Sequence, residues 1–211
     1  MGYYPIFVEM TGRPCAVVGG GLVAERKVAA LFEAGTRVTV ISPNLTTCLQ
    51  SWASEGRLNH VARDYRRGDL GEFEMVFVAT DNAEVNAAIA RDGREQRVWV
   101  NSADDPSHCD FILPSVLRRG ELVVAVGTGG SSPALARAIR EELESYFSAD
   151  YDLLLQVAAE VRVELKNRSV VANAELWRKA FADGFRNLIA AGKKAEAKTY
   201  LVRQLEGAPC K

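Results

Sequence analysis

The first hundred residues alternate between two hydrophobic patterns. Short runs of β-branched and other apolar residues have the length of buried strands, and they stand at 16–18, 38–41, 75–79 and 98–101. Between these runs, apolar residues recur at helical spacing over 22–33, 45–55 and 83–91. Shorter apolar runs predict two further strands, at 58–62 and 6–9. Strands that alternate with helices in this way predict an α/β domain with a Rossmann-type parallel sheet.

The pattern changes after residue 101. Two apolar runs at 111–117 and 121–126 are separated only by a short turn, which predicts a hairpin and not a crossover. Ser132 and Pro133 then mark the start of a helix that runs to about residue 146. From residue 151 onward strand signals stop and apolar residues keep helical spacing. We therefore expect three domains: a Rossmann-type domain, a small α+β domain and a helical C-terminal domain, at 1–110, 111–150 and 151–211.

A glycine-rich turn joins the first predicted strand to the first helix. The sequence Gly19-Gly20-Gly21-Leu22-Val23-Ala24 has the G-x-G-x-x-A pattern of dinucleotide-binding turns. Gly19 permits the tight turn, Gly21 allows the backbone to approach a pyrophosphate, and the helix start at Leu22 and Val23 offers N–H groups to the phosphates. The alternative is a glycine turn that serves only close packing. We expect Gly19, Gly21, Leu22 and Val23 to bind a cofactor.

The end of the second strand lacks the acidic residue that holds the ribose in many such domains. It carries Ser42, Pro43 and Asn44 instead. The side chains of Ser42 and Asn44 can form weaker hydrogen bonds with a ribose, and no arginine follows immediately to favour a 2′-phosphate. The sequence therefore favours NAD over NADP, with these three residues in the cofactor site.

Composition and charge narrow the function classes. The 211 residues are 48% hydrophobic and 25% charged with a net charge of −1, which excludes a disordered or fibrous chain. Residues 1–150 carry 15 basic and 20 acidic side chains, whereas residues 151–211 carry 11 and 7. This balance argues against nucleic-acid binding, although a modestly basic tail suits a small anionic ligand. Four widely spaced cysteines and the absence of a long apolar run or signal layout predict a cytoplasmic protein away from the membrane.

Several motifs together resemble one family. They are Pro5-Ile6-Phe7, the run from Val17 to Lys27, Ala79-Thr80-Asp81, Asn101 with Asp104 and Pro106, Asp110 to Pro114, and Thr128 to Arg137. In this order and spacing the chain resembles the precorrin-2 dehydrogenase/sirohydrochlorin ferrochelatase family, the N-terminal part of siroheme synthase. The resemblance covers about residues 3–147 and places Thr80 in the cofactor site.

The resemblance implies an activity and an assembly. In that family NAD accepts a hydride from precorrin-2 to give sirohydrochlorin, and some members then insert Fe²⁺ to make siroheme. It also implies a homodimer, with an N-terminal NAD domain, a central dimerisation domain and a helical C-terminal domain. We expect the methyltransferase of the longer fused synthases to belong to another chain.

Asp104 matches the key aspartate of the family. Loss of hydride leaves a cation that must lose a proton, and metal insertion requires deprotonated pyrrole nitrogens, so a carboxylate suits both reactions. The alternative is an ordinary turn, because Asp104-Asp105-Pro106 is typical turn composition. The neighbouring Asp105 departs from many relatives, and register favours Asp104 as the catalytic residue. His108 and Cys109 form no second pair of ligands, so we expect packing at this point and no resident metal site.

The loop after the hairpin is the candidate substrate site. Thr128, Gly129, Gly130 and Ser131 precede a helix start, and their amides and hydroxyls could form a cradle for the carboxylates of precorrin-2. The alternative is a capped helix after a flexible loop, and the sequence does not decide between them. The tail also carries basic residues that could face the same carboxylates or simply be solvated, namely Arg162, Lys166, Arg168, Arg178 and Lys179.

Two questions stay open at this point. A regulatory domain that senses NAD without catalysis would share the glycine turn, but it would not need the turn at Asp104 or the loop at Thr128. Within the enzyme interpretation, the residues do not decide whether iron insertion follows dehydrogenation.

Overall fold

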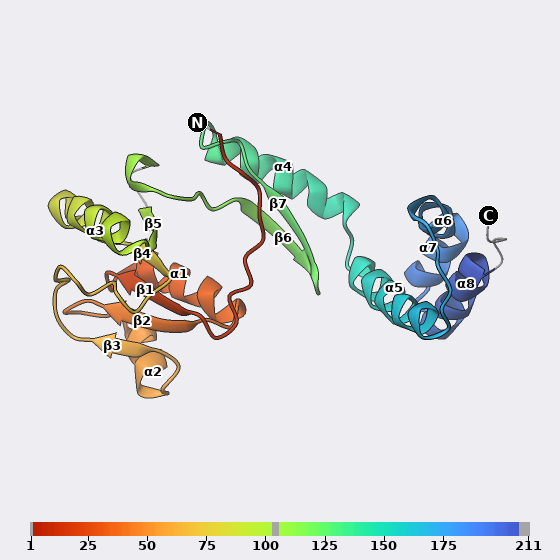
Figure 1. Cartoon of the computed structure of the whole chain (residues 1–211), viewed down its shortest axis with the longest axis horizontal. Coiled ribbons are helices and arrows are strands. Elements are labelled where there is room, and N and C mark those ends of the chain that lie inside the picture. The colour runs from red at the N-terminus through yellow and green to blue at the C-terminus, as the bar shows by residue number, and fades with distance from the viewer. Residues whose placement is uncertain (1, 103–105, 207–211) are drawn as a thin grey trace. The chain divides into compact units, whose positions relative to one another are not determined.

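The computed structural model describes residues 2–102 and 106–206, and the described chain divides into two compact units, 1–113 and 114–211. The strands of the first unit are β1 (Pro14–Val18), β2 (Arg37–Ile41), β3 (Asn59–Val61), β4 (Met75–Val78) and β5 (Trp99–Ser102). They form one parallel sheet in the order β3-β2-β1-β4-β5 (Figure 1). Its helices are α1 (Leu22–Glu33), α2 (Thr47–Ser54) and α3 (Ala83–Gln96), with a 3₁₀ turn at Pro106–His108. The predicted Rossmann-type sheet is confirmed.

The central strand β1 is buried on both faces. Cys15 and Val17 pack in one apolar cluster with α1 and α2, whereas Ala16 and Val18 pack in another with Ile89 of α3. Successive side chains of a strand point to opposite faces, so this alternation places helices on both sides of the sheet. Burial raises the pKa of the Cys15 thiol to about 11, as expected for an inert core cysteine.

Helix α3 runs five residues beyond its predicted end at 91. It ends at Gln96, followed by Arg97 with a left-handed φ of 60°. Gly93, inside the helix, lies against β5, where an added Cβ would meet the Val100 side chain at 2.3 Å. Gly93 is therefore the residue that allows the close contact between helix and strand.

The strand predicted at residues 6–9 is wrong. Residues 2–10 form no regular structure, and Ile6 and Phe7 are exposed. A strand requires a hydrogen-bonded neighbour, and the five-stranded sheet pairs elsewhere. Apolar composition alone therefore misplaced this element.

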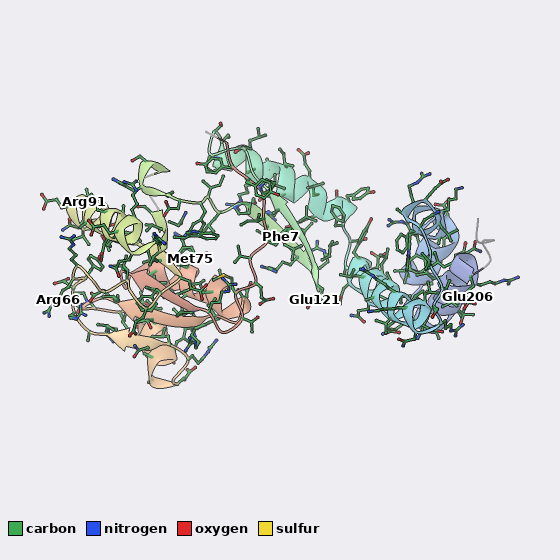
Figure 2. The ribbon with its side chains drawn as sticks, in the orientation of Figure 1. Phe7, Arg66, Met75, Arg91, Glu121 and Glu206 are labelled. Atoms are coloured by element: carbon green, nitrogen blue, oxygen red, sulfur yellow. The ribbon has the colours of Figure 1, made fainter. Side chains whose placement is uncertain are left out.

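The second unit begins with a hairpin of β6 (Ser115–Arg119) and β7 (Leu122–Val126), followed by α4 (Pro133–Tyr146). The turn is Gly120-Glu121, with Gly120 at a φ of 55° and Glu121 at the hairpin tip (Figure 2). The first strand starts four residues later than predicted, because Asp110 pairs with Val100 of β5 and Pro114 has no N–H to donate. The hairpin and the helix after it are confirmed.

The tail is helical, as predicted. Four helices, α5 (Asp150–Asn167), α6 (Ala174–Ala180), α7 (Asp183–Ala190) and α8 (Lys194–Glu206), bury one apolar cluster that includes Val161, Phe185 and Leu201 (Figure 1). Phe185 is fully buried, so this aromatic residue belongs to the core. Over the described residues, no helix combines the length and the apolar composition that a membrane crossing requires.

Candidate functional site

The glycine turn lies where the strand order reverses. The chain leaves β1, forms β2 on one side of it, and later places β4 on the other side. In open α/β sheets, ligands bind at this switch point, beyond the carboxyl ends of the strands. Gly19 N donates a hydrogen bond to the Ile41 carbonyl at 3.0 Å, and Ala79 N donates to the Val18 carbonyl at 2.8 Å. The turn is thus tied to the ends of both neighbouring strands.

The three glycines of this turn have different surroundings. Gly19 has a φ of 119°, and an added Cβ would lie 2.2 Å from the Ala79 carbonyl oxygen. A Cβ on Gly20 would lie 1.8 Å from the Asn44 carbonyl oxygen, whereas one on Gly21 would meet nothing within 4 Å. Gly19 and Gly20 are therefore required by the protein's own packing. Gly21 is open on the side where a ligand would approach.

The start of α1 has no side-chain cap. Gly21 is its N-cap and supplies no side-chain hydrogen bond to the first turn. Leu22, the first helical residue, is 72% exposed, while Ala24 is fully buried against the sheet. Free N–H groups and the positive end of the helix dipole favour an anion at this point. With the open space over Gly21, these features fit the diphosphate of a dinucleotide.

The loop after β2 lies directly over this turn. Ser42 is buried, and its hydroxyl donates to the Asn44 carbonyl at 2.8 Å. The ring nitrogen Nε2 of His60 lies 2.9 Å from the Ser42 carbonyl oxygen, to which it donates. Ser42 therefore shapes the loop, whereas Pro43 and Asn44 are exposed and can contact a ribose.

Thr80 follows β4 on the other side of the turn. Its hydroxyl donates to Asn86 Oδ1 at 2.6 Å and accepts a bond from Asn82 N at 3.2 Å. Asn86 Nδ2 returns a bond to the Thr80 carbonyl at 3.0 Å. These contacts fix the β4–α3 connection beside Gly19, where its backbone forms one wall of the turn.

Asp104 lies outside the described residues, but the chain on both sides of it is described. Asp110 Oδ2 accepts a hydrogen bond from Val100 N at 2.8 Å, and Asp110 N donates to the Val100 carbonyl at 2.8 Å. The Cys109 thiol accepts from Ser102 N at 3.2 Å and donates to the Ser102 carbonyl at 3.3 Å. Residues 109 and 110 are thereby held against the end of β5.

One basic residue of α1 lies over the sheet near this point. The Lys27 ammonium group is 5.7 Å from the centre of the Phe77 ring. Burial lowers the pKa of Lys27, with a smaller contribution in the same direction from the neighbouring charge of Arg26. The Lys27 ammonium group is therefore partly withdrawn from water.

The loop of the second unit uses its hydroxyl groups internally. Thr128 Oγ1 donates to the Ser132 carbonyl at 2.9 Å and accepts from Ser132 N at 3.1 Å. Ser132 Oγ then accepts from Leu135 N, which caps α4 as the sequence predicts. Gly129 and Gly130 have positive φ values and open space around them. The described contacts are those of a capped helix, and substrate contact by residues 128–131 stays a prediction.

The structure thus brings the cofactor candidates to one edge of the sheet. Gly19, Gly21, Leu22 and Val23 lie at the turn, and the list is completed by Ser42, Pro43, Asn44 and Thr80. Gly20 is not among the residues predicted for the cofactor site, because it occupies a variable position of the G-x-G-x-x-A pattern. The sequence also did not indicate the hydrogen bond from the Thr46 hydroxyl to Glu25 Oε2, at 2.6 Å, which joins the loop after β2 to α1. The run of three consecutive glycines was the only local sequence signal for Gly20, and Glu25 and Thr46 had no local signal.

The comparisons with known proteins agree with this geometry. A family model described as putative NAD(P)-binding matches residues 6–115, more than half of the chain, and one described as sirohaem biosynthesis protein central matches residues 119–146. A solved structure titled SirC, precorrin-2 dehydrogenase superposes with a TM-score of 0.78 at 28% identity, covering 94% of this chain and 98% of that one. The chain belongs to the precorrin-2 dehydrogenase/sirohydrochlorin ferrochelatase family. The NAD(P) binding expected from the glycine turn is confirmed by the family model.

Curated relatives of the family are longer. Siroheme synthase of Nitrosococcus oceani is 40% identical over 209 residues, which are 98% of this chain and 45% of that protein. Siroheme synthase of Methylobacillus flagellatus is 38% identical over 205 residues, which are 96% of this chain and 44% of that protein. The chain spans a little under half the length of these family members.

Proposed function

We propose that this chain oxidises precorrin-2 to sirohydrochlorin with NAD as the hydride acceptor, as a step in siroheme biosynthesis. The observation that carries the proposal is its similarity, over nearly its whole length, to a precorrin-2 dehydrogenase. The turn at Gly21, which is open to a diphosphate, supports it independently. The overall reaction is precorrin-2 + NAD⁺ → sirohydrochlorin + NADH + H⁺.

Asp104 is the proposed general base of this reaction. Bound NAD supplies the hydride acceptor, and loss of hydride leaves a cationic macrocycle that must lose a proton. The Asp104 carboxylate accepts that proton, which leaves a neutral product. The assignment rests on the match of Asp104 to the key aspartate of the family, and a carboxylate at the same point would serve deprotonation before Fe²⁺ enters as a substrate.

Precorrin-2 carries eight carboxylates, so its site must hold anions. In the second unit, the amides at residues 129–131 precede the positive end of α4 and are the proposed contacts. In the tail, Arg168 is paired with Glu164 and Glu206, and Lys179 is paired with Glu175. The pairing directs these two cations to neighbouring acidic groups. Arg168 and Lys179 are therefore weaker candidates for substrate binding than the amides of the second unit.

The proposed assembly is a homodimer through the second unit. A two-stranded sheet is marginal alone and needs a cover on each face. Helix α4 packs on the hairpin, yet Val116 and Leu135 are 39% and 53% exposed. A second copy of the same hairpin and helix would bury these apolar side chains. The proposed compartment is the cytoplasm, where core thiols such as Cys15 stay reduced.

The proposal favours NAD over NADP because Arg63, a cation that follows the neighbouring strand β3, is already paired with a carboxylate. Arg63 follows β3, which pairs with β2 beside the loop at residues 42–44. Its guanidinium donates two hydrogen bonds to Asp69, at 2.7 and 2.8 Å, and this pairing lowers the pKa of Asp69. A 2′-phosphate would compete with Asp69 for Arg63.

We expect NAD to bind about tenfold more tightly than NADP. Asp69→Asn should narrow this ratio, because it removes the charge that holds Arg63. Calorimetric titration with both dinucleotides gives the ratio. Glu74→Gln is the matched control, since it releases Arg13 at the opposite edge of the sheet and should leave the ratio unchanged. Equal ratios in the wild type and Asp69→Asn would remove Arg63 and Asp69 from cofactor selection.

An anaerobic assay tests the proposed function. The purified chain, precorrin-2 and NAD should yield sirohydrochlorin, identified by its absorption spectrum, and reactions without the chain or without NAD should not. Addition of Fe²⁺ to the product, with and without the chain, measures iron insertion in the same experiment. A chain that binds NAD and leaves precorrin-2 unchanged would support an NAD-sensing domain instead.

A further inference from the structure

Thr46 links the loop after β2 to the glycine turn by hydrogen bonds. Its backbone N–H donates to the Gly20 carbonyl at 2.9 Å, and its hydroxyl donates to Glu25 Oε2 at 2.6 Å. The same hydroxyl accepts from Leu49 N at 3.3 Å and so caps α2. Thr46 therefore contacts the turn, the first helix and the second helix at once.

Glu25 occupies an unexpected position for an anion site. It lies in the first turn of α1, four residues after the Gly21 N-cap, where a carboxylate is favourable to the free helix but repels a diphosphate. Thr46 bonds this carboxylate to the N-terminus of α2, so its charge has a partner on another helix. Cys48 of α2 lies close enough to feel this charge: burial first and then the Glu25 carboxylate raise the pKa of its thiol.

The two loops joined in this way are the two halves of the cofactor site. The turn at Gly21 faces the diphosphate, and Pro43 and Asn44 are the exposed residues of the ribose loop. Gly20 packs so closely on the Asn44 carbonyl that no Cβ fits between them. The distance between the halves is therefore determined by the contacts of Gly20 and Thr46.

We propose that Glu25 and Thr46 are positioning residues for the dinucleotide. Their hydrogen bond holds the ribose loop against the glycine turn and directs the Glu25 carboxylate toward α2, away from the diphosphate amides. This proposal rests on the NAD site of the proposed function. It adds a pair of residues that acts on the cofactor indirectly, through the residues that contact it.

Calorimetric titration of NAD into the full chain tests the pair. Glu25→Ala should weaken binding about tenfold, the cost of one hydrogen bond to a charged group. Glu25→Gln should restore binding to within about threefold of the wild type, because its amide oxygen can accept from Thr46. Glu33→Ala, on the last turn of the same helix and exposed, is the matched control and should bind as the wild type does.

The series separates the proposal from simpler explanations. If Glu25 acted only as a repelling charge, both Glu25→Ala and Glu25→Gln would bind NAD more tightly. If it had no role, Glu25→Ala would bind as the wild type does, and either result overturns the proposal. A wild-type chain that gives no heat with NAD would instead overturn the proposed function.

A second pair of variants, at Thr46, separates an effect on NAD binding from an effect on folding. Thr46→Ser keeps the hydroxyl donor and the helix cap, and Thr46→Val loses both. We expect Thr46→Ser to bind NAD within about threefold of the wild type and Thr46→Val to bind about tenfold more weakly. Thermal unfolding of each variant is measured alongside. Weak binding by Thr46→Ser, with unchanged thermal stability, would contradict the role of the hydroxyl.

Discussion

Replacing Asp104 with asparagine should lower the turnover of precorrin-2 by about a hundredfold or more, with NAD affinity unchanged. General-base catalysis contributes roughly 10²–10⁴ to a rate, and the amide cannot accept the proton that the oxidised macrocycle must lose. The measurements are the steady-state rate of sirohydrochlorin formation and a calorimetric titration with NAD. A loss of rate with intact cofactor binding would place Asp104 in the chemistry and not in the cofactor site.

Asp105 provides the matched control for this variant. Asp105→Asn removes an adjacent carboxylate of the same turn and should retain most of the activity. If the two variants exchanged their effects, Asp105 would be the base, and the register from the family motif would be wrong by one residue. Full activity in both variants would remove this turn from the mechanism.

Gly21→Ala should weaken NAD binding at least about tenfold while the chain stays folded. An added Cβ there meets no protein atom within 4 Å, and the φ of −87° suits alanine. The expected cost to α1 is the loss of a favourable N-cap, about 0.5–1 kcal/mol. The methyl group would lie where the diphosphate approaches the backbone. The substitution should therefore reduce NAD affinity more than it reduces the stability of the fold.

Gly19→Ala is the contrasting variant. Gly19 has a φ of 119°, and an added Cβ would lie 2.2 Å from the Ala79 carbonyl oxygen. The substitution should therefore destabilise the fold itself, by about 2 kcal/mol or more. Urea unfolding and NAD titration of both variants give the comparison. Wild-type NAD affinity in Gly21→Ala would show that no diphosphate lies at this turn.

The glycine turn could be predicted from the sequence because its signals are local. A strand, three glycines and a helix start follow one another within ten residues, and each is dictated by backbone conformation. The same holds for the Ser132 cap of α4. The failure at residues 6–9 could not be foreseen in this way, since these residues have strand composition but no strand beside them.

The contacts between residues that are far apart in the sequence could not be predicted either. Glu25 and Thr46 are 21 positions apart, and only the parallel packing of β1 and β2 brings their helices together. The Ser42 hydroxyl bonds to the Asn44 carbonyl two residues on, a contact that the sequence did not indicate, and contact of Ser42 with a ribose stays a prediction. Such contacts depend on which loop covers which turn, and hydrophobic periodicity carries no information about that.

The amounts of NADH and sirohydrochlorin formed in one anaerobic reaction test the central claim most directly. If the chain transfers a hydride from precorrin-2 to NAD, the two products should appear in equal amounts and at the same rate. Sirohydrochlorin formed without a matching rise of NADH absorbance, or no change in either, would contradict the proposed reaction.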